Sequence, residues 1–309
     1  YAIPLLLVTV SLFFIQQRLL RRGRYTTVGG KGGIREPFRL GRWRWPIFAI
    51  CVIPPLLSLL LPYAALIVTS LSNAWGRGIV PGNLTFRWYR WALVDNLAAR
   101  QAIQHSLTYA AAAATIATAL ALFTAYVAGR RLLPGARLLG YIATAPFVVP
   151  GIVLAIGFFA AYARPPVVLY GTPWILIVAF ATRFLPIAYA GSEAGLRSID
   201  IELEHCARTL GSSQLRTFGR ITLPMLRRGI LANWLLTFIP SLRELSSAIF
   251  LFTPATAVIT TLIFDLSDEG NYEAVSALGI IMMALTFGLV AVGYRLFGAS
   301  ALAQRQGVR

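Results

Sequence analysis

The chain carries few side chains that could do chemistry, and none of them stands in a catalytic motif. A zinc hydrolase needs two histidines in an H-E-x-x-H pattern on one helix, and a serine hydrolase needs G-x-S-x-G. Neither pattern occurs, and the two histidines, His105 and His205, lie far apart in the sequence. We therefore expect no enzymatic activity, no metal site and no cofactor in this chain; an intramembrane protease or lipid transferase is the less favoured alternative.

A glycine-rich segment, Tyr25 to Gly33, resembles a phosphate-binding loop only in composition. Such a loop requires G-x-x-x-x-G-K-[ST], but here Lys31 is followed by Gly32 and Tyr25 occupies the first glycine position. The segment is interpreted as part of a flexible basic linker. Any ATP and magnesium that the protein depends on must then be bound by a separate subunit.

Two further polar segments could bind ligands of other kinds. Residues 84–93 interleave aromatic and arginine side chains, which favours a helix at a membrane interface over a nucleic-acid surface. Residues 263–273 carry four acidic side chains, but their spacing is not the D-x-[DN]-x-[DN]-G pattern of a calcium loop. We interpret this second segment as a solvated loop that faces a partner protein, and we expect no nucleic-acid partner.

The composition places the chain in a lipid bilayer. Hydrophobic residues make up 57% of the sequence and charged residues 13%, with a mean hydropathy of +0.70, which is too apolar for a soluble domain of 309 residues. The basic residues that produce the net charge of +17 lie between apolar runs, so they indicate the topology of the chain in the membrane. The two cysteines, Cys51 and Cys206, predict no disulfide framework.

Apolar runs predict an all-α, polytopic membrane helix bundle of about seven transmembrane helices. The first run, Ala2 to Ile15, is shorter than the roughly 20 residues that a span needs, so residues 1–17 are interpreted as a truncated span, the last of a preceding half. The other six candidate spans are Pro46 to Asn73, Ile103 to Ala128, Leu139 to Tyr162, Pro173 to Ala190, Ile230 to Leu251 and Val275 to Phe297.

The basic residues predict the orientation of these spans. Alternate connections, namely residues 18–44, 130–137 and 197–228 and the tail from Arg295, hold 21 of the 28 lysines and arginines, and the remaining connections hold five. Positive charge marks the cytoplasmic side. We therefore expect a basic cytoplasmic linker at 18–45, a six-span domain at 46–297 and a cytoplasmic tail at 298–309.

Charged residues and prolines inside the predicted spans are candidates for a translocation pathway. Charge is costly within a bilayer, so Arg183, Arg243 and Glu244 predict either a pathway or gating role, or structural pairs between helices. Arg243 and Glu244 are adjacent and point about 100° apart on a helix, so each is expected to find its partner on another helix. Pro146 and Pro150 predict a kink, at a cavity or at a tight helix crossing.

The longest polar interruption, residues 191–228, predicts two short helices joined at Gly211. Asp200, Glu202 and Glu204 at the start and Arg208 near the end suit the dipole of the first helix, and Gly211 suits the left-handed position that ends it. The first helix carries an apolar stripe of Leu203, Cys206, Ala207 and Leu210.

The second helix is expected to begin after Ser212 or Ser213 as its cap and to end at Pro224. Its apolar stripe consists of Leu215, Phe218 and Thr222. The two helices together are too short to bury a core, so they must pack against another element.

This segment resembles the cytoplasmic EAA loop of permeases in binding-protein-dependent ABC importers, whose pattern is E-A-A, three residues, Gly, nine residues, Ile-x-Leu-Pro. Ala207, Gly211, Ile221, Leu223 and Pro224 match this pattern. The sequence departs from it in two places, with His205 for the glutamate and Cys206 for the first alanine, while Glu204 lies one residue early.

The resemblance implies a type I ABC importer permease in a bacterial inner membrane, whose EAA loop docks on a cytoplasmic ATPase dimer. It further implies a second permease half or second copy and a periplasmic or extracellular solute-binding protein. Residues 25–33, 243–254 and 262–270 are similar to segments of ferric-iron permeases, so the resemblance is greatest to the C-terminal half of those proteins. Permeases for aminoethylphosphonate, polyamines and thiamine share many of these features. A passive channel is a further alternative that ATP dependence would distinguish.

Overall fold

The computed structural model of the chain describes residues 41–306. The predicted truncated span at 1–17, the linker up to residue 40 and residues 307–309 lie outside the described residues. Contacts divide the chain into two compact units, Tyr1–Leu61 and Pro62–Arg309. The described part of the first unit is a short 3₁₀ turn, η1 (Gly41–Trp43), and the beginning of α2 (Arg44–Ser70), whose side chains are mostly exposed.

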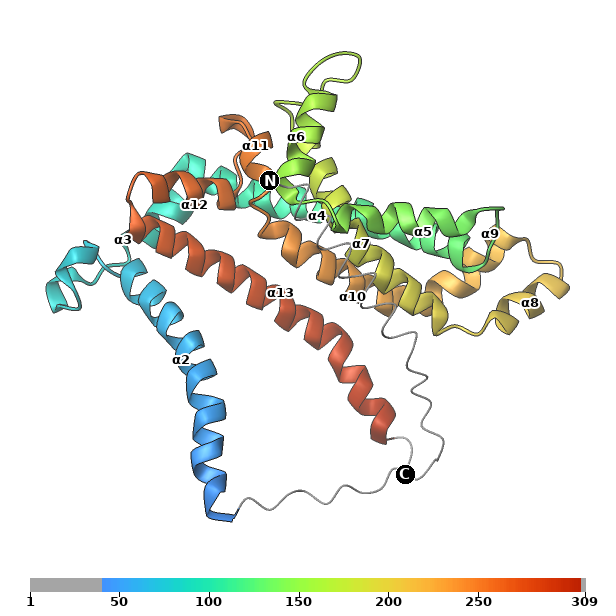
Figure 1. The fold of residues 1–309 in the computed structure, drawn as a ribbon, viewed down its shortest axis with the longest axis horizontal. Coiled ribbons are helices and arrows are strands. Elements are labelled where there is room, and N and C mark those ends of the chain that lie inside the picture. Colours follow the sequence, from blue (N-terminus) through green and yellow to red (C-terminus); the bar gives the residue numbers. More distant parts are fainter. Residues whose placement is uncertain (1–40, 307–309) are drawn as a thin grey trace. The chain divides into compact units, whose positions relative to one another are not determined.

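The second unit is built from helices, which confirms the all-α prediction (Figure 1). Its longer helices are α4 (Leu97–Gly129), α5 (Ala136–Thr144), α6 (Gly151–Tyr162), α7 (Pro173–Arg197), α8 (Ile201–Thr209), α10 (Leu223–Leu242), α12 (Ile259–Asp268) and α13 (Tyr272–Gln306). Between them lie the short helices α3 (Arg87–Arg90), α9 (Gln214–Thr217) and α11 (Ala248–Leu251), the π-helical turns η4 (Trp91–Asp95) and η6 (Phe218–Thr222), and the 3₁₀ turns η2 (Trp75–Arg77), η3 (Pro81–Asn83), η5 (Ala145–Phe147) and η7 (Pro254–Thr256).

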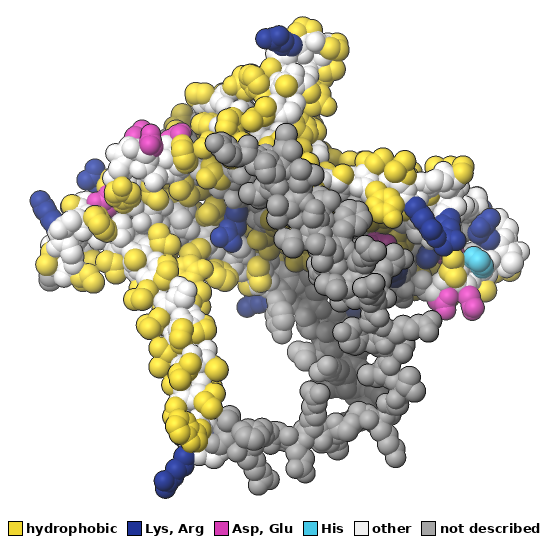
Figure 2. All heavy atoms as spheres, viewed as in Figure 1, with side chains coloured by type: hydrophobic (Ala, Val, Ile, Leu, Met, Phe, Trp, Pro, Cys, Tyr) yellow, Lys and Arg dark blue, Asp and Glu magenta, His cyan; other side chains and the backbone are white. Residues whose placement is uncertain are grey.

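Four of the described helices are long and apolar enough to cross a membrane: Gly41–Ser70, Leu97–Gly129, Pro173–Arg197 and Tyr272–Gly293. A fifth candidate is the pair Ala136–Phe147 and Gly151–Tyr162, which is bent by 108°. The predicted span at Ile230 to Leu251 falls below this criterion, because α10 carries Arg227, Arg228 and Asn233 and ends at Leu242. Hydrophobic side chains cover much of the described surface in view (Figure 2), as expected of a protein embedded in lipid.

The core of the second unit lies where α4, α7 and α10 pack together. The buried face of α4 is formed by small residues, and Ala110, Ala113, Ala114, Ala117 and Ala121 are all 0% exposed. Small side chains let helix backbones approach closely, which is how helices associate where lipid removes the hydrophobic driving force. Larger side chains from α7, among them Ile175, Leu176 and Phe180, fill the remaining space.

A buried amide joins α7 to α10 at the middle of this core. The Asn233 side chain donates from Nδ2 to the carbonyl oxygen of Ala188, at 2.7 Å, and to Ser192 Oγ, at 3.1 Å. These two bonds fix the amide so that its Oδ1 faces Gly191, where a Cβ atom would overlap with Oδ1 and Cγ of Asn233. Glycine is therefore required at position 191 by the space available.

Two aromatic residues of the segment 84–93, Trp88 and Trp91, take part in internal packing, whereas Phe86 and the neighbouring arginines remain exposed. Trp88 and Trp91 pack against a cluster from α12 and α13 that contains Ile259 and Leu278, and Trp88 Nε1 donates to the Ser72 carbonyl oxygen at 3.0 Å. The acidic segment at 263–273 contacts another loop of the same unit at the surface, where the Glu273 carboxylate accepts an exposed hydrogen bond of 2.7 Å from the Trp75 backbone N–H.

We predict that Gly191→Ala lowers the free energy of unfolding by about 2 kcal/mol, the usual cost of forcing an extra methyl group into a packed interior. Thermal unfolding of the purified chain in detergent measures the effect. Gly279→Ala is the matched control, because a Cβ at position 279 meets no atom within 4 Å. Equal melting temperatures for the two variants would show that the packing of α7 on α10 is looser than described.

Candidate functional site

The polar interruption forms a projection of two short helices, α8 and α9, at one end of the second unit (Figure 1). Its first helix begins at Asp200, whose Oδ1 accepts a hydrogen bond of 3.0 Å from the Glu202 backbone N–H. Glu202 and Glu204 lie in the first turn and Arg208 in the last. This arrangement satisfies a free N–H group and opposes the helix dipole with charge at both ends.

The end of α8 is fixed by Gly211, which has φ +85° as the sequence predicts. The Ser212 N–H donates to the Ala207 carbonyl oxygen at 3.0 Å, and the Gly211 N–H donates to that of Arg208 at 3.0 Å. These two bonds form a Schellman motif, which needs a left-handed residue at the position of Gly211. The direction in which the second helix leaves the first is therefore set by the backbone.

The second helix begins after Ser213, as predicted, but it does not end at Pro224. Ser213 occupies the position before α9, but its side chain makes no capping bond. Pro224 does not end the helix, because α9, η6 and α10 follow one another with helical backbone angles from Gln214 to Leu242. Proline is tolerated there because it lies in the first turn of α10, directly after the π-helical turn, whose wider backbone relieves the clash of the ring with the preceding turn.

The projection is attached to the bundle through Glu204, which is only 5% exposed. Its Oε1 accepts hydrogen bonds from Arg130 Nη2 at 2.9 Å, from Arg130 Nε at 3.2 Å and from Thr222 Oγ1 at 3.0 Å. Its Oε2 accepts a bond of 3.3 Å from the Tyr126 hydroxyl. One carboxylate thus joins α8 to the end of α4 and to the turn η6.

An aromatic contact reinforces the same junction. Tyr126 packs on Phe218, with ring centroids 4.4 Å apart, and Thr217 and Thr222 are buried beside them. The predicted stripe Leu215, Phe218, Thr222 therefore does not form a single face: Phe218 and Thr222 point inward and Leu215 is 79% exposed. The π-helical turn contributes by moving Thr222 away from the spacing of a regular helix. Phe218 precedes that shift and faces inward because it packs on Tyr126.

Sequence reasoning missed Arg130, Tyr126 and Thr222 as partners of Glu204. The available signal was the pair Arg130-Arg131 directly after the α4 span, since a charge at a span end that becomes buried needs an acidic partner. Glu204 lies 74 residues away in sequence from Arg130. Local periodicity does not reveal a pairing over that distance.

The opposite side of the projection is apolar and exposed. Leu210 is 89% exposed, Leu203 is 45% exposed, and His205 and Cys206 are exposed beside them. A shallow hollow of about 390 Å³ lies between the two helices. It is lined by Ala207, Leu210, Gly211, Ser212, Arg216, Arg220 and Ile221. Leu223 and Pro224 are also exposed, at the start of α10. This face could receive another protein, and its rim of arginines favours an acidic partner.

The predicted span at Leu139 to Tyr162 is broken, and the prolines lie at the break. Pro146 is in the turn η5 and Pro150 precedes α6, and the two flanking segments meet at 108°. Arg183 of α7 donates from Nη1 to the Val149 carbonyl oxygen at 2.6 Å. The arginine therefore satisfies a carbonyl at the break, as a buried backbone group requires.

The expectation that Glu244 finds its partner on another helix is wrong. Its carboxylate accepts hydrogen bonds from the Ser246 hydroxyl, from the Ser247 N–H at 2.9 Å and from the Ser247 hydroxyl at 3.2 Å, all within its own segment. The predicted span breaks here, since α10 ends at Leu242 and α11 begins at Ala248. The carboxylate thus finds its partners in the turn before α11, where it satisfies the Ser247 N–H. Arg243 is exposed at the end of α10.

Comparison with known protein families gives one match over most of the bundle. Residues 122–300 match the family described as the inner membrane component of binding-protein-dependent transport systems. The matched range includes the junction around Glu204 and both broken helices.

Among curated proteins, the ferric transport system permease protein of Actinobacillus pleuropneumoniae is 25% identical over 93% of this chain, and the match covers 42% of that protein. The chain thus spans less than half the length of this relative. The putative 2-aminoethylphosphonate permease of Salmonella typhi is 27% identical over 74% of this chain and 86% of its own length. The putrescine permease of Escherichia coli is 31% identical over 72% of this chain and 80% of its own length.

Solved structures share the fold. A bacterial ABC transporter involved in alginate import matches 82% of this chain and 96% of its own, with a TM-score of 0.64 at 16% identity. The MetNI methionine ABC transporter matches 68% of this chain with a TM-score of 0.55 at 15% identity. At these identities the likeness establishes the arrangement of helices.

We predict that Glu204→Ala lowers the free energy of unfolding by about 3 kcal/mol or more, because it leaves the Arg130 charge buried without a partner. The control is Glu193→Ala, which breaks an exposed ion pair of 2.7 Å with Arg197 and should cost about 1 kcal/mol or less. Thermal unfolding in detergent measures both. Equal losses in the two variants would contradict the role given to the Glu204 junction.

Proposed function

The chain belongs to the family of inner membrane components of binding-protein-dependent transport systems, and we propose that it is the permease subunit of an ABC importer whose α8–α9 projection couples an ATPase to the membrane helices. The observation that carries this proposal is the division of the projection into two faces. One face is anchored by the Glu204–Arg130 ion pair. The other presents exposed leucines around a hollow.

These two faces have the properties that a mechanical connection requires. Exposed apolar side chains on a short helix suit docking in a groove of a partner protein. A buried, multiply bonded carboxylate then transmits the displacement of that helix to α4 and α10, since a packed interior moves as a unit. The site residues for this coupling are those of the predicted loop, with Arg130, Tyr126 and Thr222 added as anchors.

ATP hydrolysis must be supplied by the partner, because the sequence contains no phosphate-binding motif. We propose a cytoplasmic ATPase dimer that binds ATP and magnesium, a second permease half or second copy, and a solute-binding protein on the outer side. The solved alginate ABC transporter in complex with a periplasmic protein supports the last of these. The loop at 191–228 and the C-terminus are assigned to the cytoplasm from the distribution of arginines.

The broken helices are proposed to line the route of the solute. Arg183 binds the carbonyl at the α5–α6 break, and the α10–α11 break lies against the same place, because a Cβ at Gly151 would overlap with Ser246 Oγ. Irregular backbone at membrane depth is tolerated where protein or a water-filled cavity surrounds it. Arg183, Pro146 and Pro150 are therefore candidates for gating, with Glu244 shaping the second break and Arg243 exposed beside it.

We propose ferric iron, delivered by the binding protein, as the transported substrate. The ferric permease match covers 93% of this chain, more than the 74% covered by the aminoethylphosphonate permease. The 31% identity of the putrescine permease makes polyamine the second candidate.

We predict that Leu210→Ala combined with Leu215→Ala weakens binding of the ATPase at least tenfold while the melting temperature stays unchanged. Exposed positions contribute little to folding, but apolar side chains at the centre of an interface each contribute about 1 kcal/mol or more to binding. Co-purification and ATPase stimulation in liposomes measure the effect. Ile79→Ala, at a position 72% exposed away from the projection, is the control; unchanged ATPase binding in the double variant would refute the docking surface.

The substrate is tested by calorimetric titration of the cognate binding protein with chelated ferric ion, 2-aminoethylphosphonate and putrescine. We expect saturable binding of ferric ion alone, and the same preference in uptake by liposomes that contain the complete transporter. Binding of either organic solute without ferric binding would replace iron as the substrate and leave the permease assignment intact.

A further inference from the structure

The loop between α4 and α5 forms a small concave site beside the anchored junction. Its volume is about 320 Å³. It is lined by Arg131, Leu133, Gly135, Ala136 and Arg137. The loop follows the α4 span directly and leads into the first helix of the bent pair. It therefore lies at the boundary between the membrane and water.

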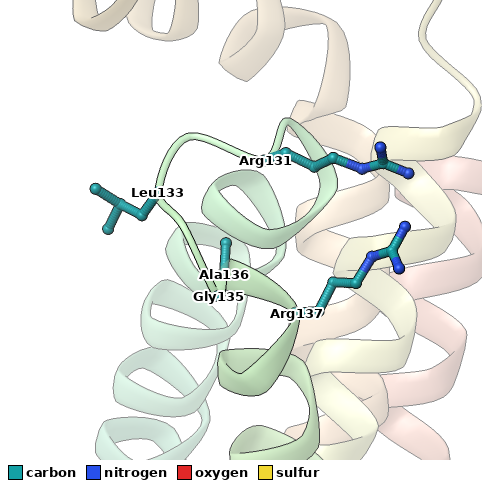
Figure 3. A pocket seen from close by; sticks show the side chains of 5 residues that line it. All are labelled: Arg131, Leu133, Gly135, Ala136 and Arg137. Atoms are coloured by element: carbon teal, nitrogen blue, oxygen red, sulfur yellow. The ribbon is translucent and has the colours of Figure 1, made fainter.

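The site presents two arginines without a carboxylate between them. Figure 3 shows the Arg131 and Arg137 side chains extending to the same side of the loop, with their guanidinium groups facing one another. Residues 130–137 include no acidic residue, and the ion pairs in the described part of the chain involve neither arginine. The third arginine of the loop, Arg130, is neutralised by Glu204. Two converging positive charges favour an anion between them.

The backbone holds this arrangement in place. Among residues 41–306, Arg131 is the non-glycine residue with a positive φ, 52°, and Gly135 has φ 75°. The loop is closed by hydrogen bonds from the Leu132 N–H to the Val127 carbonyl oxygen, at 3.1 Å, and from the Ala136 N–H to that of Leu133, at 3.2 Å. A left-handed arginine is a costly conformation. Its presence in a closed loop means that the backbone positions of both arginines are set before any ligand arrives.

The surface around the arginines is apolar. Leu133 is 58% exposed, and on α5 Leu138 is 62%, Tyr141 73% and Ile142 58% exposed. In the space-filling view, basic side chains gather beside hydrophobic ones at this end of the bundle (Figure 2). A free anion gains nothing from such surroundings. A ligand with a negatively charged head and hydrocarbon chains satisfies both the arginines and the exposed leucines.

We propose that Arg131 and Arg137 bind the phosphate of an anionic phospholipid, whose acyl chains lie along the exposed face of α5. The leaflet concerned follows from the proposed orientation, which makes it the cytoplasmic one. Anionic lipids attract basic residues at this surface. The lipid would thereby brace the α4 end that carries the Glu204 junction.

The test uses the full chain in nanodiscs and short-chain dioctanoyl phosphatidylglycerol as the probe, with dioctanoyl phosphatidylcholine as the neutral counterpart. The R131Q/R137Q variant should bind phosphatidylglycerol about 25-fold more weakly, roughly fivefold for each arginine, as measured by native mass spectrometry and thermal shift. R131K/R137K, which keeps the charges, should bind within a few-fold of the unaltered chain and shows that the loop still folds. R42Q/R44Q removes two exposed arginines elsewhere and should leave binding unchanged.

Four outcomes would overturn the proposal. They are equal binding by R131Q/R137Q and the unaltered chain, equal losses in R42Q/R44Q, binding of inorganic phosphate as tightly as the lipid, and loss of ATPase association with unchanged lipid binding. Orientation is checked separately in a Cys51→Ala background, in which the exposed Cys206 should react with a membrane-impermeant maleimide only from the cytoplasmic side. Failure of that labelling would count against the proposed topology, but the measured binding of the anionic lipid by Arg131 and Arg137 would not be affected.

Discussion

The contact between the Glu204 carboxylate and the Arg130 guanidinium holds the α8–α9 projection against the bundle. Both side chains are nearly buried, at 6% and 12% exposure, so each would be costly without the other. Thr222 and Tyr126 donate further hydrogen bonds to Oε1 and Oε2 of this carboxylate, and these bonds offset part of the desolvation cost of the ion pair. Without this contact, α8 would be an isolated helix of nine residues, which is too short to be stable in water.

The rest of the bundle provides a rigid support for this contact. The alanine face of α4 allows α7 and α10 to approach closely, and Asn233 ties those two helices to each other. Tyr126 and Arg130 lie at the end of the same α4 helix. A displacement applied to α8 therefore reaches the three central helices through short, well-packed contacts.

Local features of the projection could be predicted from the sequence, and long-range ones could not. Asp200, Gly211 and the exposed positions of Leu203 and Leu210 follow from helix periodicity and capping, which depend on neighbours a few residues away. The partners of Glu204 come from helices far apart in the sequence, so no local pattern shows them. Of the two helix breaks, only the first could be predicted. Pro146 and Pro150 indicated a bend, but the turn at Glu244 lies within a hydrophobic run that gave no sign of a break.

The π-helical turn Phe218–Thr222 explains part of a further discrepancy. A regular helical pattern places Leu215, Phe218 and Thr222 on one face, but the wider turn moves Thr222 away from Leu215. Phe218 precedes that shift and faces inward because it packs on Tyr126. The same turn accommodates Pro224 without ending the helix. An irregular turn and one aromatic contact thus decide which side chains anchor the projection and which remain exposed.

The exposure of Leu210 and Leu215, at 89% and 79%, also bears on the life of the protein in a cell. An unassembled subunit displays these leucines to chaperones and proteases, which recognise apolar side chains in water. If the proposed docking is right, assembly would hide them, and the lifetime of the subunit would depend on the supply of its partner. The surface that would transmit work in the finished transporter would then also ensure that surplus copies are removed.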